Sequence, residues 1–440
     1  MMCLRRRTAK GLAVCTSGVL GAAFFAAFAA ASHAAAPDWP QFRGPDRDGK
    51  CAETGLLKEW PKGGPKLLWK VSGLGRGFSD IAIVGGKFYT MGDRTPSGED
   101  EGQFVLAFDL QSRKELWATR IGPPYAESGG GPRCTPTVDG ELLYVVGTEG
   151  DLACLDAASG KIVWKKSFAK DFGGKMMSMW KYSESPLVDG EKLVCTPGGK
   201  QAMMVALDKK TGQLIWQCAV PPLGNRGKDG AGYASMIAAE LDGVRQYVQT
   251  IGRGVIGVDA QTGKFLWGYN KIANNVANIP TSLARDGNVF VTTSYETGSA
   301  LLKPAHGSDT WDAKEVYFLK YRDFENHHGG IVLVGDYVYG GSGRNSGALV
   351  CLDFKTGKIA WRQKPVGKGS AALLYADGHL IFRYEDGTMA LVEANPKEFK
   401  LKGTFKTALV NGKSWPYPVI HDGKLYLRDQ DDLMCYDIRQ

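Results

Sequence analysis

The sequence predicts an all-β protein, an eight-bladed β-propeller in which four-stranded antiparallel blades close into a ring. Three observations predict this architecture. A tryptophan motif recurs at spacings of 47, 52 and 51 residues, a tight turn recurs between short apolar runs, and the two chain ends supply complementary parts of one blade. A repeat period of this length is typical of propellers and solenoids.

Residues 1–36 are predicted to form a signal peptide. The basic stretch RRRTAK at residues 5–10 precedes an uncharged apolar run over residues 11–31, and small residues follow at Ala34 and Ala36. This order is typical of an exported chain that signal peptidase cleaves. A signal anchor is the alternative, because the run is about long enough to span a bilayer, but the alanine-rich composition favours cleavage. We therefore expect a periplasmic or secreted protein without a transmembrane anchor after cleavage.

The composition after the leader is that of an ordinary soluble globular protein. The whole chain has 54 basic and 46 acidic residues, and the leader holds four of the basic ones and none of the acidic ones, so the remainder carries a net charge of +4. This weak excess argues against nucleic-acid binding. We expect a turn-rich N-terminal arm over residues 37–66 and the propeller over residues 67–440.

The tryptophan motif predicts the outer half of each blade. A small residue is followed by an aspartate, a Ser/Thr-Gly pair and a tryptophan in the stretches 107–117 (with Arg113 in place of glycine), 154–164, 206–216, 257–267 and 351–361. We expect the aspartate to accept hydrogen bonds from the following turn and the glycine to supply a left-handed residue. We expect the tryptophans to pack between blades, each burying about 150–250 Å². These structural residues are Trp69, Trp117, Trp164, Trp216, Trp267 and Trp361.

The second marker predicts a hairpin in every blade. Short runs rich in Val, Ile, Leu and Tyr flank eight dipeptides: Gly85-Gly86, Asp139-Gly140, Asp189-Gly190, Asp242-Gly243, Asp286-Gly287, Gly335-Asp336, Asp377-Gly378 and Asp422-Gly423. Such dipeptides suit type I′ turns, in which both central residues have positive φ. Together the two markers give four antiparallel strands per unit, and eight such units make a propeller.

The two chain ends are predicted to share one blade. The last unit ends shortly after its aspartate, Asp437, and lacks a tryptophan strand, whereas the segment KLLWKV around Trp69 precedes the first hairpin. We therefore expect Trp69 to pair beside the strand at 433–438. Closing the ring in this way removes the exposed edges of an open sheet.

Seven cysteines remain after the leader, an odd number that includes no CxxC and no adjacent pair. This spacing argues against a zinc ribbon and against a covalently attached c-type haem. Cys154, Cys351 and Cys435 occupy the small-residue position of the tryptophan motif. We expect them to behave as small buried hydrophobic residues.

The tryptophan motif resembles the docking motif of the quinoprotein, or PQQ-like, propellers. The repeat covers residues 67–440, and the stretches DWPQFRGPDRDG and NHHGGIVLVGDYVYGG resemble those of uncharacterised exported PQQ-like propeller proteins. The resemblance implies one of two functional classes. One class contains exported dehydrogenases that bind pyrroloquinoline quinone and calcium. The other contains non-catalytic proteins, including the outer-membrane protein assembly lipoprotein, an eight-bladed scaffold.

The chain departs from the pattern of the dehydrogenases. Those enzymes typically close a ring between vicinal cysteines over the quinone, and their haem-linked members carry CxxCH, but this chain has neither feature. Their catalytic aspartate and calcium ligands match no position of this sequence. We therefore expect no cofactor, with pyrroloquinoline quinone and calcium as the alternative.

Candidate binding residues lie in the segments that lead into the first strand of each blade and in the loops between the two middle strands. In a propeller these segments gather at one mouth of the central channel, where polar and aromatic side chains can form a binding site. A solvated channel rim is the alternative. The candidates are Arg133, Glu184, Tyr233, Arg253, Asn278, His327, His328, Arg344, Lys368, Trp415 and Tyr417. No catalytic residue is assigned.

The adjacent pair His327-His328 is the most distinctive of these candidates. Histidines can bind metals or shuttle protons, but neighbouring side chains in a strand point to opposite faces. A packed or hydrogen-bonded pair is therefore the favoured interpretation. Only five histidines remain after the leader, and we predict no metal site.

These features favour an exported, non-catalytic propeller scaffold that binds or assembles an envelope or secreted protein partner. One alternative is a quinone-dependent alcohol dehydrogenase. The other is a propeller that binds a polysaccharide through its aromatic and polar channel mouth.

Overall fold

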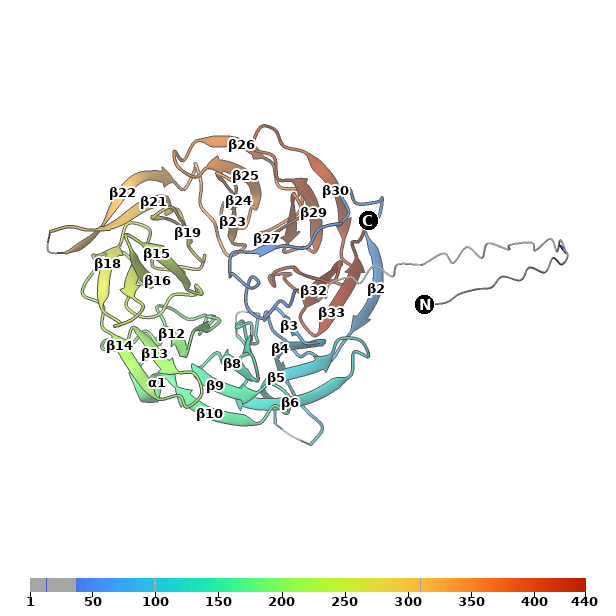
Figure 1. The fold of residues 1–440 in the computed structure, drawn as a ribbon, viewed down its shortest axis with the longest axis horizontal. Helices are drawn as coiled ribbons and strands as arrows, with labels where there is room; N and C mark the ends of the chain where they lie inside the picture. The colour runs from blue at the N-terminus through green and yellow to red at the C-terminus, as the bar shows by residue number, and fades with distance from the viewer. Residues whose placement is uncertain (1–12, 14–36, 99, 128, 309) are drawn as a thin grey trace, which may run out of the picture. The chain divides into compact units, whose positions relative to one another are not determined.

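The computed structural model describes residue 13 and residues 37–440, apart from residues 99, 128 and 309. Except for residue 13, the predicted signal peptide lies outside the described residues. Residues 37–440 contain eight antiparallel sheets arranged in a ring (Figure 1), which confirms the predicted eight-bladed propeller. Within the described ranges the one helix is α1 (Phe168–Phe172), and no helix there is long and apolar enough to cross a membrane.

The first four blades follow one another along the chain. Blade 1 consists of β3 (Ala82–Val84), β4 (Lys87–Arg94), β5 (Gly102–Asp109) and β6 (Glu115–Gly122). Blade 2 consists of β7 (Thr137–Asp139), β8 (Leu142–Val146), β9 (Asp151–Asp156) and β10 (Ile162–Ser167). Blade 3 consists of β11 (Leu187–Asp189), β12 (Lys192–Cys195), β13 (Met204–Asp208) and β14 (Leu214–Cys218). Blade 4 consists of β15 (Ile237–Leu241), β16 (Val244–Ile251), β17 (Gly254–Asp259) and β18 (Phe265–Tyr269).

The last four blades include two strands from the N-terminal side. Blade 5 consists of β19 (Leu283–Arg285), β20 (Asn288–Thr293), β21 (Gly298–His306) and β22 (Trp311–Lys320). Blade 6 consists of β23 (Ile331–Val334), β24 (Tyr337–Ser342), β25 (Ala348–Asp353) and β26 (Ile359–Gln363). Blade 7 consists of β27 (Ala371–Ala376), β28 (His379–Tyr384), β29 (Thr388–Glu393) and β30 (Leu401–Lys406), with β1 (Lys50–Cys51) as a fifth, parallel strand. Blade 8 consists of β31 (Val419–His421), β32 (Lys424–Asp429), β33 (Asp432–Asp437) and β2 (Lys66–Val71).

Blade 8 closes the ring in the predicted way. Strand β2 pairs antiparallel with β33, and Trp69 lies opposite Cys435. The buried Arg428 of β32 donates hydrogen bonds to the carbonyl oxygens of Gly75 and Ser79, which lie just before blade 1. The closure therefore rests both on strand pairing and on a buried guanidinium that joins blade 8 to blade 1.

A β-bulge precedes the tryptophan position in every blade. In blade 1, Trp117 pairs with Ala107 and Glu115 pairs with Phe108, so Leu116 is the extra residue. The same register shift separates the third strand from the outer strand in the other seven blades. Bulges re-aim side chains, and here the extra residue sets the tryptophan opposite the small residue of the motif.

The residue opposite each indole explains the small position of the motif. These residues are Ala107, Cys154, Ala206, Gly257, Cys351 and Cys435. A Cβ atom on Gly257 would lie 2.1 Å from Nε1 of Trp267, which shows how little space the ring leaves. The seven described cysteines are buried and free, which confirms the prediction for the three in this position.

The indoles lie in the seams between blades. Trp117 Nε1 donates to the Ala157 carbonyl of blade 2 at 3.2 Å, and its ring lies against Gly160, where a Cβ atom would come within 2.5 Å of it. Trp164 Nε1 donates to the Lys209 carbonyl of blade 3 at 3.0 Å in the same way. These positions require glycine because a ring from the preceding blade leaves no space for a Cβ atom.

Blades 4, 5 and 7 depart from this pattern, and in blade 7 Gly403 stands where the other blades carry an aromatic ring. Blade 5 replaces the Ser/Thr-Gly turn with the long hairpin of β21 and β22, and Trp267 Nε1 instead donates to Gln246 Oε1 of its own blade at 2.7 Å. In blade 5 the tyrosine Tyr317 takes the place of the indole and covers Gly357 of blade 6.

The turn after each motif aspartate has the predicted geometry. Asp156 Oδ1 accepts a hydrogen bond from the Ser159 amide at 2.7 Å, and Asp208 Oδ1 accepts one from the Thr211 amide at 2.8 Å. The following Gly212 has a φ of +71°. Arg113 keeps a φ of +62° although it is not glycine, so the turn dictates the backbone even where the residue is less suited to it.

The eight hairpins follow the predicted dipeptides with one difference. Both central residues have positive φ in five of them, at 85–86, 242–243, 286–287, 377–378 and 422–423. In the other three the glycine is the first central residue: Asp139 stays in β7 and pairs with Leu142, so Gly140 and Glu141 form the turn. A glycine in that place suits a type II′ turn, so the prediction of type I′ turns throughout was wrong at three sites.

The first part of the N-terminal arm, up to β1 on the inner edge of blade 7, lies in the centre of the ring (Figure 1). Arg47 is buried and donates hydrogen bonds to the carbonyl oxygens of Ser185 and Met236, which belong to the starts of blades 3 and 4. Arg43 is also buried and donates to the Ile331 carbonyl of blade 6. The arm thus fills part of the channel and ties together blades on opposite sides of it.

A buried carboxyl group joins blades 3 and 4. Glu184 accepts hydrogen bonds from the Thr196 amide at 2.7 Å and from Gln249 Nε2 at 3.0 Å. Burial raises its pKa to about 7, against the smaller lowering effects of these bonds and of Arg47. The folded protein therefore keeps this group protonated at pH values where the unfolded chain ionises it.

We predict that Gly212→Ala destabilises the propeller more than Gly190→Ala in the same blade. Both glycines have positive φ, which costs a larger residue about 1–2 kcal/mol, but only at Gly212 would the new Cβ atom contact a ring, 2.8 Å from Trp164. Overpacking adds about 1–3 kcal/mol to the loss in the free energy of unfolding. Urea denaturation measures both losses, and equal losses would contradict the seam contact.

We predict that Glu184→Gln flattens the pH dependence of stability. In the natural chain the raised pKa of Glu184 stabilises the fold fully below about pH 4.5, and this contribution declines by about 3 kcal/mol as the pH rises to 7. Burial also raises the pKa of Asp80 to about 7, so Asp80 still contributes to the pH dependence of stability in the variant. Urea midpoints at pH 4.5 to 8 test this, with Glu141→Gln at an exposed position as the control; parallel profiles for all three proteins would refute it.

Candidate functional site

A cavity of about 290 Å³ lies where the lead-in segments of the blades meet. Its lining comes from seven of the eight blades and from Phe42 of the N-terminal arm. Seven of the eleven candidate residues line it, namely Arg133, Tyr233, His327, His328, Arg344, Trp415 and Tyr417. The fold gathers these residues because every lead-in segment ends at an inner strand.

The other four candidates lie outside this lining. Glu184 belongs to the buried network between blades 3 and 4. Arg253 forms an ion pair with Asp229 at 2.7 Å. Asn278 is fully buried and donates to the Ile251 carbonyl at 3.0 Å. Lys368, just before blade 7, is likewise absent from the lining.

Three cationic side chains of the lining pair with aromatic rings. The Arg133 guanidinium lies 5.5 Å from the centre of the Phe78 ring, and the Arg344 guanidinium lies 4.9 Å from that of Tyr295. The Lys413 ammonium lies 5.1 Å from the Trp415 ring. Such pairs position the cations at the cavity wall, and the Lys413 ammonium also lies 3.5 Å from the Glu385 carboxylate.

Asp80 is the one carboxylate among the described lining residues, and it serves the structure. Its Oδ1 accepts a hydrogen bond from the Tyr417 amide at 2.6 Å, and its Oδ2 accepts one from Thr135 Oγ1 at 3.2 Å. It joins the lead-in segments of blades 1, 2 and 8. Both oxygens are thus occupied by bonds that hold the cavity wall together.

His327 and His328 both line the cavity because they precede strand β23, which begins at Ile331. The alternation of side chains in a strand therefore does not apply to them. His327 Nδ1 lies 2.9 Å from Ser370 Oγ and its Nε2 lies 2.9 Å from the Tyr295 hydroxyl. Burial, together with the neighbouring His328, lowers the pKa of His327 to about 3, so this ring is neutral.

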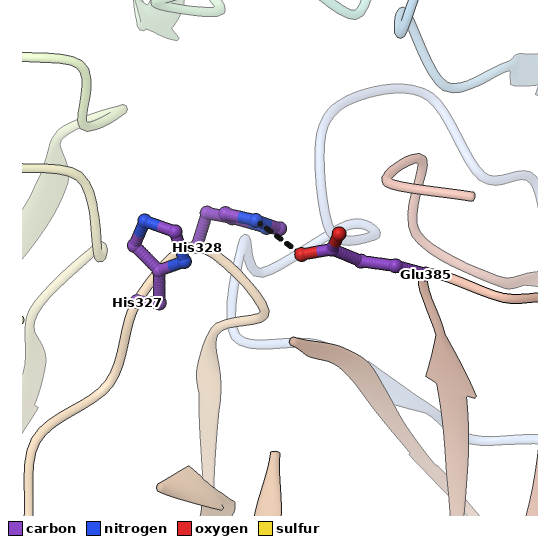
Figure 2. Close-up of side chains that lie close together, drawn as sticks. All are labelled: His327, His328 and Glu385. Carbon is purple, nitrogen blue, oxygen red and sulfur yellow. Dashed lines mark ion pairs between the residues drawn. The ribbon is translucent and has the colours of Figure 1, made fainter. Parts of the chain in front are cut away.

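Glu385, from the loop between β28 and β29, faces His328 (Figure 2). Its Oε1 lies 3.2 Å from His328 Nε2. Burial alone would raise the pKa of Glu385, but the contact with His328 and the hydrogen bond from the Ser370 amide hold it at about 2. The carboxylate is therefore ionised across the physiological range.

Sequence reasoning missed Asp80, Trp180, Tyr295, Lys413 and Glu385. A signal for three of them was present. Asp80 lies in the lead-in segment of blade 1, and Tyr295 and Glu385 lie in the middle loops of blades 5 and 7, at the place that Arg344 holds in blade 6. Trp180 and Lys413 lie in long segments without a repeat pattern, and nothing in the sequence indicates which of their residues face the channel.

The lining fits only part of the quinone and calcium that the resemblance implies. Arg133, Arg344 and Lys413 with the neighbouring rings suit a planar anionic group. Calcium takes about six to eight oxygen ligands, and Asp80, the one carboxylate of the described lining, already accepts two hydrogen bonds. The residues present therefore do not fit calcium.

Comparisons with known proteins give two groups of relatives. The outer membrane protein assembly factor BamB of Shewanella oneidensis is 24% identical over 242 residues, which are 53% of this chain and 57% of that protein. The dehydrogenase subunit of the quinone alcohol dehydrogenase of Komagataeibacter europaeus is 26% identical over 247 residues, which are 52% of this chain and 32% of that protein. The matches thus span less than two thirds of either relative.

The fold itself recurs in solved structures. The quinohemoprotein alcohol dehydrogenase of Comamonas testosteroni superposes with a TM-score of 0.64 at 14% identity, covering 91% of this chain and 80% of that one. A family model described as outer membrane protein assembly factor BamB matches residues 101–345 and 297–398. This chain therefore belongs to that family of PQQ-like β-propellers.

Proposed function

We propose that this protein is an exported, non-catalytic scaffold of the cell envelope that binds a protein partner at the mouth of the axial cavity. Membership of the BamB family supports a scaffold that takes part in outer-membrane protein assembly. The observation that carries the proposal is the cavity lining: it combines cationic and aromatic side chains with a single carboxylate that is committed to hydrogen bonds within the wall.

The cationic and aromatic pairs define the chemistry of the partner. Arginine, tryptophan and tyrosine dominate the binding energy of protein interfaces, and here they surround a preformed concave surface. Carboxylates of the partner would pair with Arg133, Arg344 and Lys413. The partner is therefore a segment that carries acidic residues next to an aromatic or apolar side chain.

A quinone-dependent alcohol dehydrogenase is the second candidate function. The match to the Komagataeibacter europaeus enzyme favours it, and so do the three cationic groups and the rings of the lining, which suit a planar anion. It would require a base at the cavity, and the carboxylate of Asp80 is occupied by the Tyr417 amide and by Thr135.

We predict that a photo-crosslinking residue at Met179 captures one defined partner in the envelope. Met179 is 59% exposed and adjoins the lining residue Trp180, whereas Val163, 49% exposed on the outer strand β10, serves as the matched control. Arg344→Glu should reduce capture by about tenfold or more, since a hot-spot contact contributes on the order of 2 kcal/mol. Arg226→Glu, an exposed arginine away from the lining, should leave it unchanged. Equal capture at 163 and 179 would remove the proposal.

We predict that pyrroloquinoline quinone with calcium supports no dye-linked alcohol oxidation by the purified protein. The physical reason is that Asp80, the one carboxylate of the described lining, already accepts two hydrogen bonds. Titration of the quinone followed by an alcohol oxidation assay measures this. Stoichiometric binding with turnover, abolished by Arg344→Glu but not by Arg226→Glu, would establish the dehydrogenase instead.

A further inference from the structure

Two histidines that line the cavity lie close to one glutamate of blade 7 that is outside the lining. One ligand atom each from His327, His328 and Glu385 lies within 4.8 Å of the other two, and among the described residues this is the one such group of three (Figure 2). The histidines come from the lead-in segment of blade 6 and the carboxylate from the middle loop of blade 7. No local motif links them, since more than fifty residues separate them in the chain.

The donor set is that of a transition-metal ion. Imidazole nitrogens and a carboxylate oxygen are preferred ligands of zinc and its neighbours, whereas calcium prefers oxygen alone. Zinc–ligand bonds of about 2.0–2.2 Å place neighbouring ligands of a tetrahedron about 3.3–3.6 Å apart. His328 Nε2 and Glu385 Oε1 are 3.2 Å apart, so these two already stand near that spacing, and the His327 ligand atom lies within 4.8 Å of both.

We propose that His327, His328 and Glu385 bind a divalent transition-metal ion of the zinc class, with a fourth position open to the cavity. Three protein ligands with one open position are typical of zinc sites that bind a further ligand. Arg344 and Lys413 line the same cavity, so the ligand at that position would be an anion such as a carboxylate. This inference goes beyond the scaffold role and does not depend on it.

The surroundings hold the three ligands in place. Ser370 contacts two of them: its amide donates to Glu385 Oε1 at 3.1 Å, and its hydroxyl lies 2.9 Å from His327 Nδ1. The Tyr295 hydroxyl lies 2.9 Å from His327 Nε2, so whichever ring nitrogen binds the metal, a hydroxyl group orients the other. Partners of this kind fix ring orientation and raise metal affinity.

His328 is positioned by packing and has an uncommitted nitrogen. Its ring centre lies 4.9 Å from the Trp415 ring and 4.4 Å from that of His327. Its Nε2 is buried and makes no hydrogen bond of normal geometry within the described residues, and Glu385 faces it. A metal ion between this nitrogen and the carboxylate would satisfy both groups.

One nearby cation opposes metal binding. The Lys413 ammonium lies 3.5 Å from Glu385 Oε2, and its side chain is 58% exposed. An exposed lysine can turn away into solvent, but while it is near it competes for the carboxylate. Removal of this charge should therefore tighten metal binding, which a purely structural role for the three ligands would not explain.

Metal binding to the chelator-treated protein tests the proposal. Isothermal titration with Zn²⁺ should give one site per chain, and Co²⁺ should give visible absorption bands of a four-coordinate site. Ca²⁺ should give no heat at this site. Absence of Zn²⁺ and Co²⁺ binding to the natural chain would overturn the proposal without any variant.

Variants separate this site from adventitious binding. His328→Ala and Glu385→Gln should each weaken Zn²⁺ binding by about 100-fold or more, Ser370→Ala by about tenfold, and Lys413→Gln should strengthen it. His421→Ala, at a half-buried histidine outside the cavity lining, is the control and should have no effect. Thermal melts without metal check that each variant folds, and if His328→Ala fails to fold, Glu385→Gln and Lys413→Gln still decide the matter. Equal affinity in all variants would place the ion elsewhere and refute the site.

Discussion

The contact of an aromatic ring with a bare glycine of the next blade is the constraint on which the ring depends. The ring of Trp117 covers Gly160 and that of Trp164 covers Gly212, and Gly263 and Gly357 are covered in the same way by Trp216 and Tyr317. At these four seams one blade can approach the next because one residue lacks a side chain. The bulge before the tryptophan and the small residue opposite it serve the same contact from within the blade. The glycine, the bulge and the small residue of the motif therefore have one physical cause, the packing of an indole between two blades.

Much of this architecture could be predicted because it repeats. The aspartate, the glycine and the tryptophan act within one blade or with the next one, and their spacing is visible in the sequence. What could not be predicted arises where the repeat is broken: Trp267 bonds to Gln246 of its own blade because blade 5 lacks the turn that the indole would cover. In three hairpins the glycine is the first central residue of the turn and the second has negative φ, and the dipeptide alone does not predict this difference.

The candidate site was only partly predictable because its residues come from seven blades. Lead-in segments gather at the channel, so Arg133, His327 and Trp415 could be placed there from topology alone. Whether a side chain faces the channel or the seam depends on the conformation of each irregular segment. Asn278, for example, is buried and donates a hydrogen bond to the Ile251 carbonyl instead of lining the cavity. Glu385 was missed because only tertiary structure brings the loop of blade 7 to the histidines of blade 6.

The arginines in the channel have a consequence for how the protein comes to be folded. Arg43 and Arg47 belong to the part of the chain that is synthesised early, yet Arg43 bonds to Ile331 and β2 pairs with β33, which are made late. Contacts of such long sequence separation slow folding. Blades that assembled in order of synthesis would still have to admit the arm, and the ring cannot close before β33 has been synthesised.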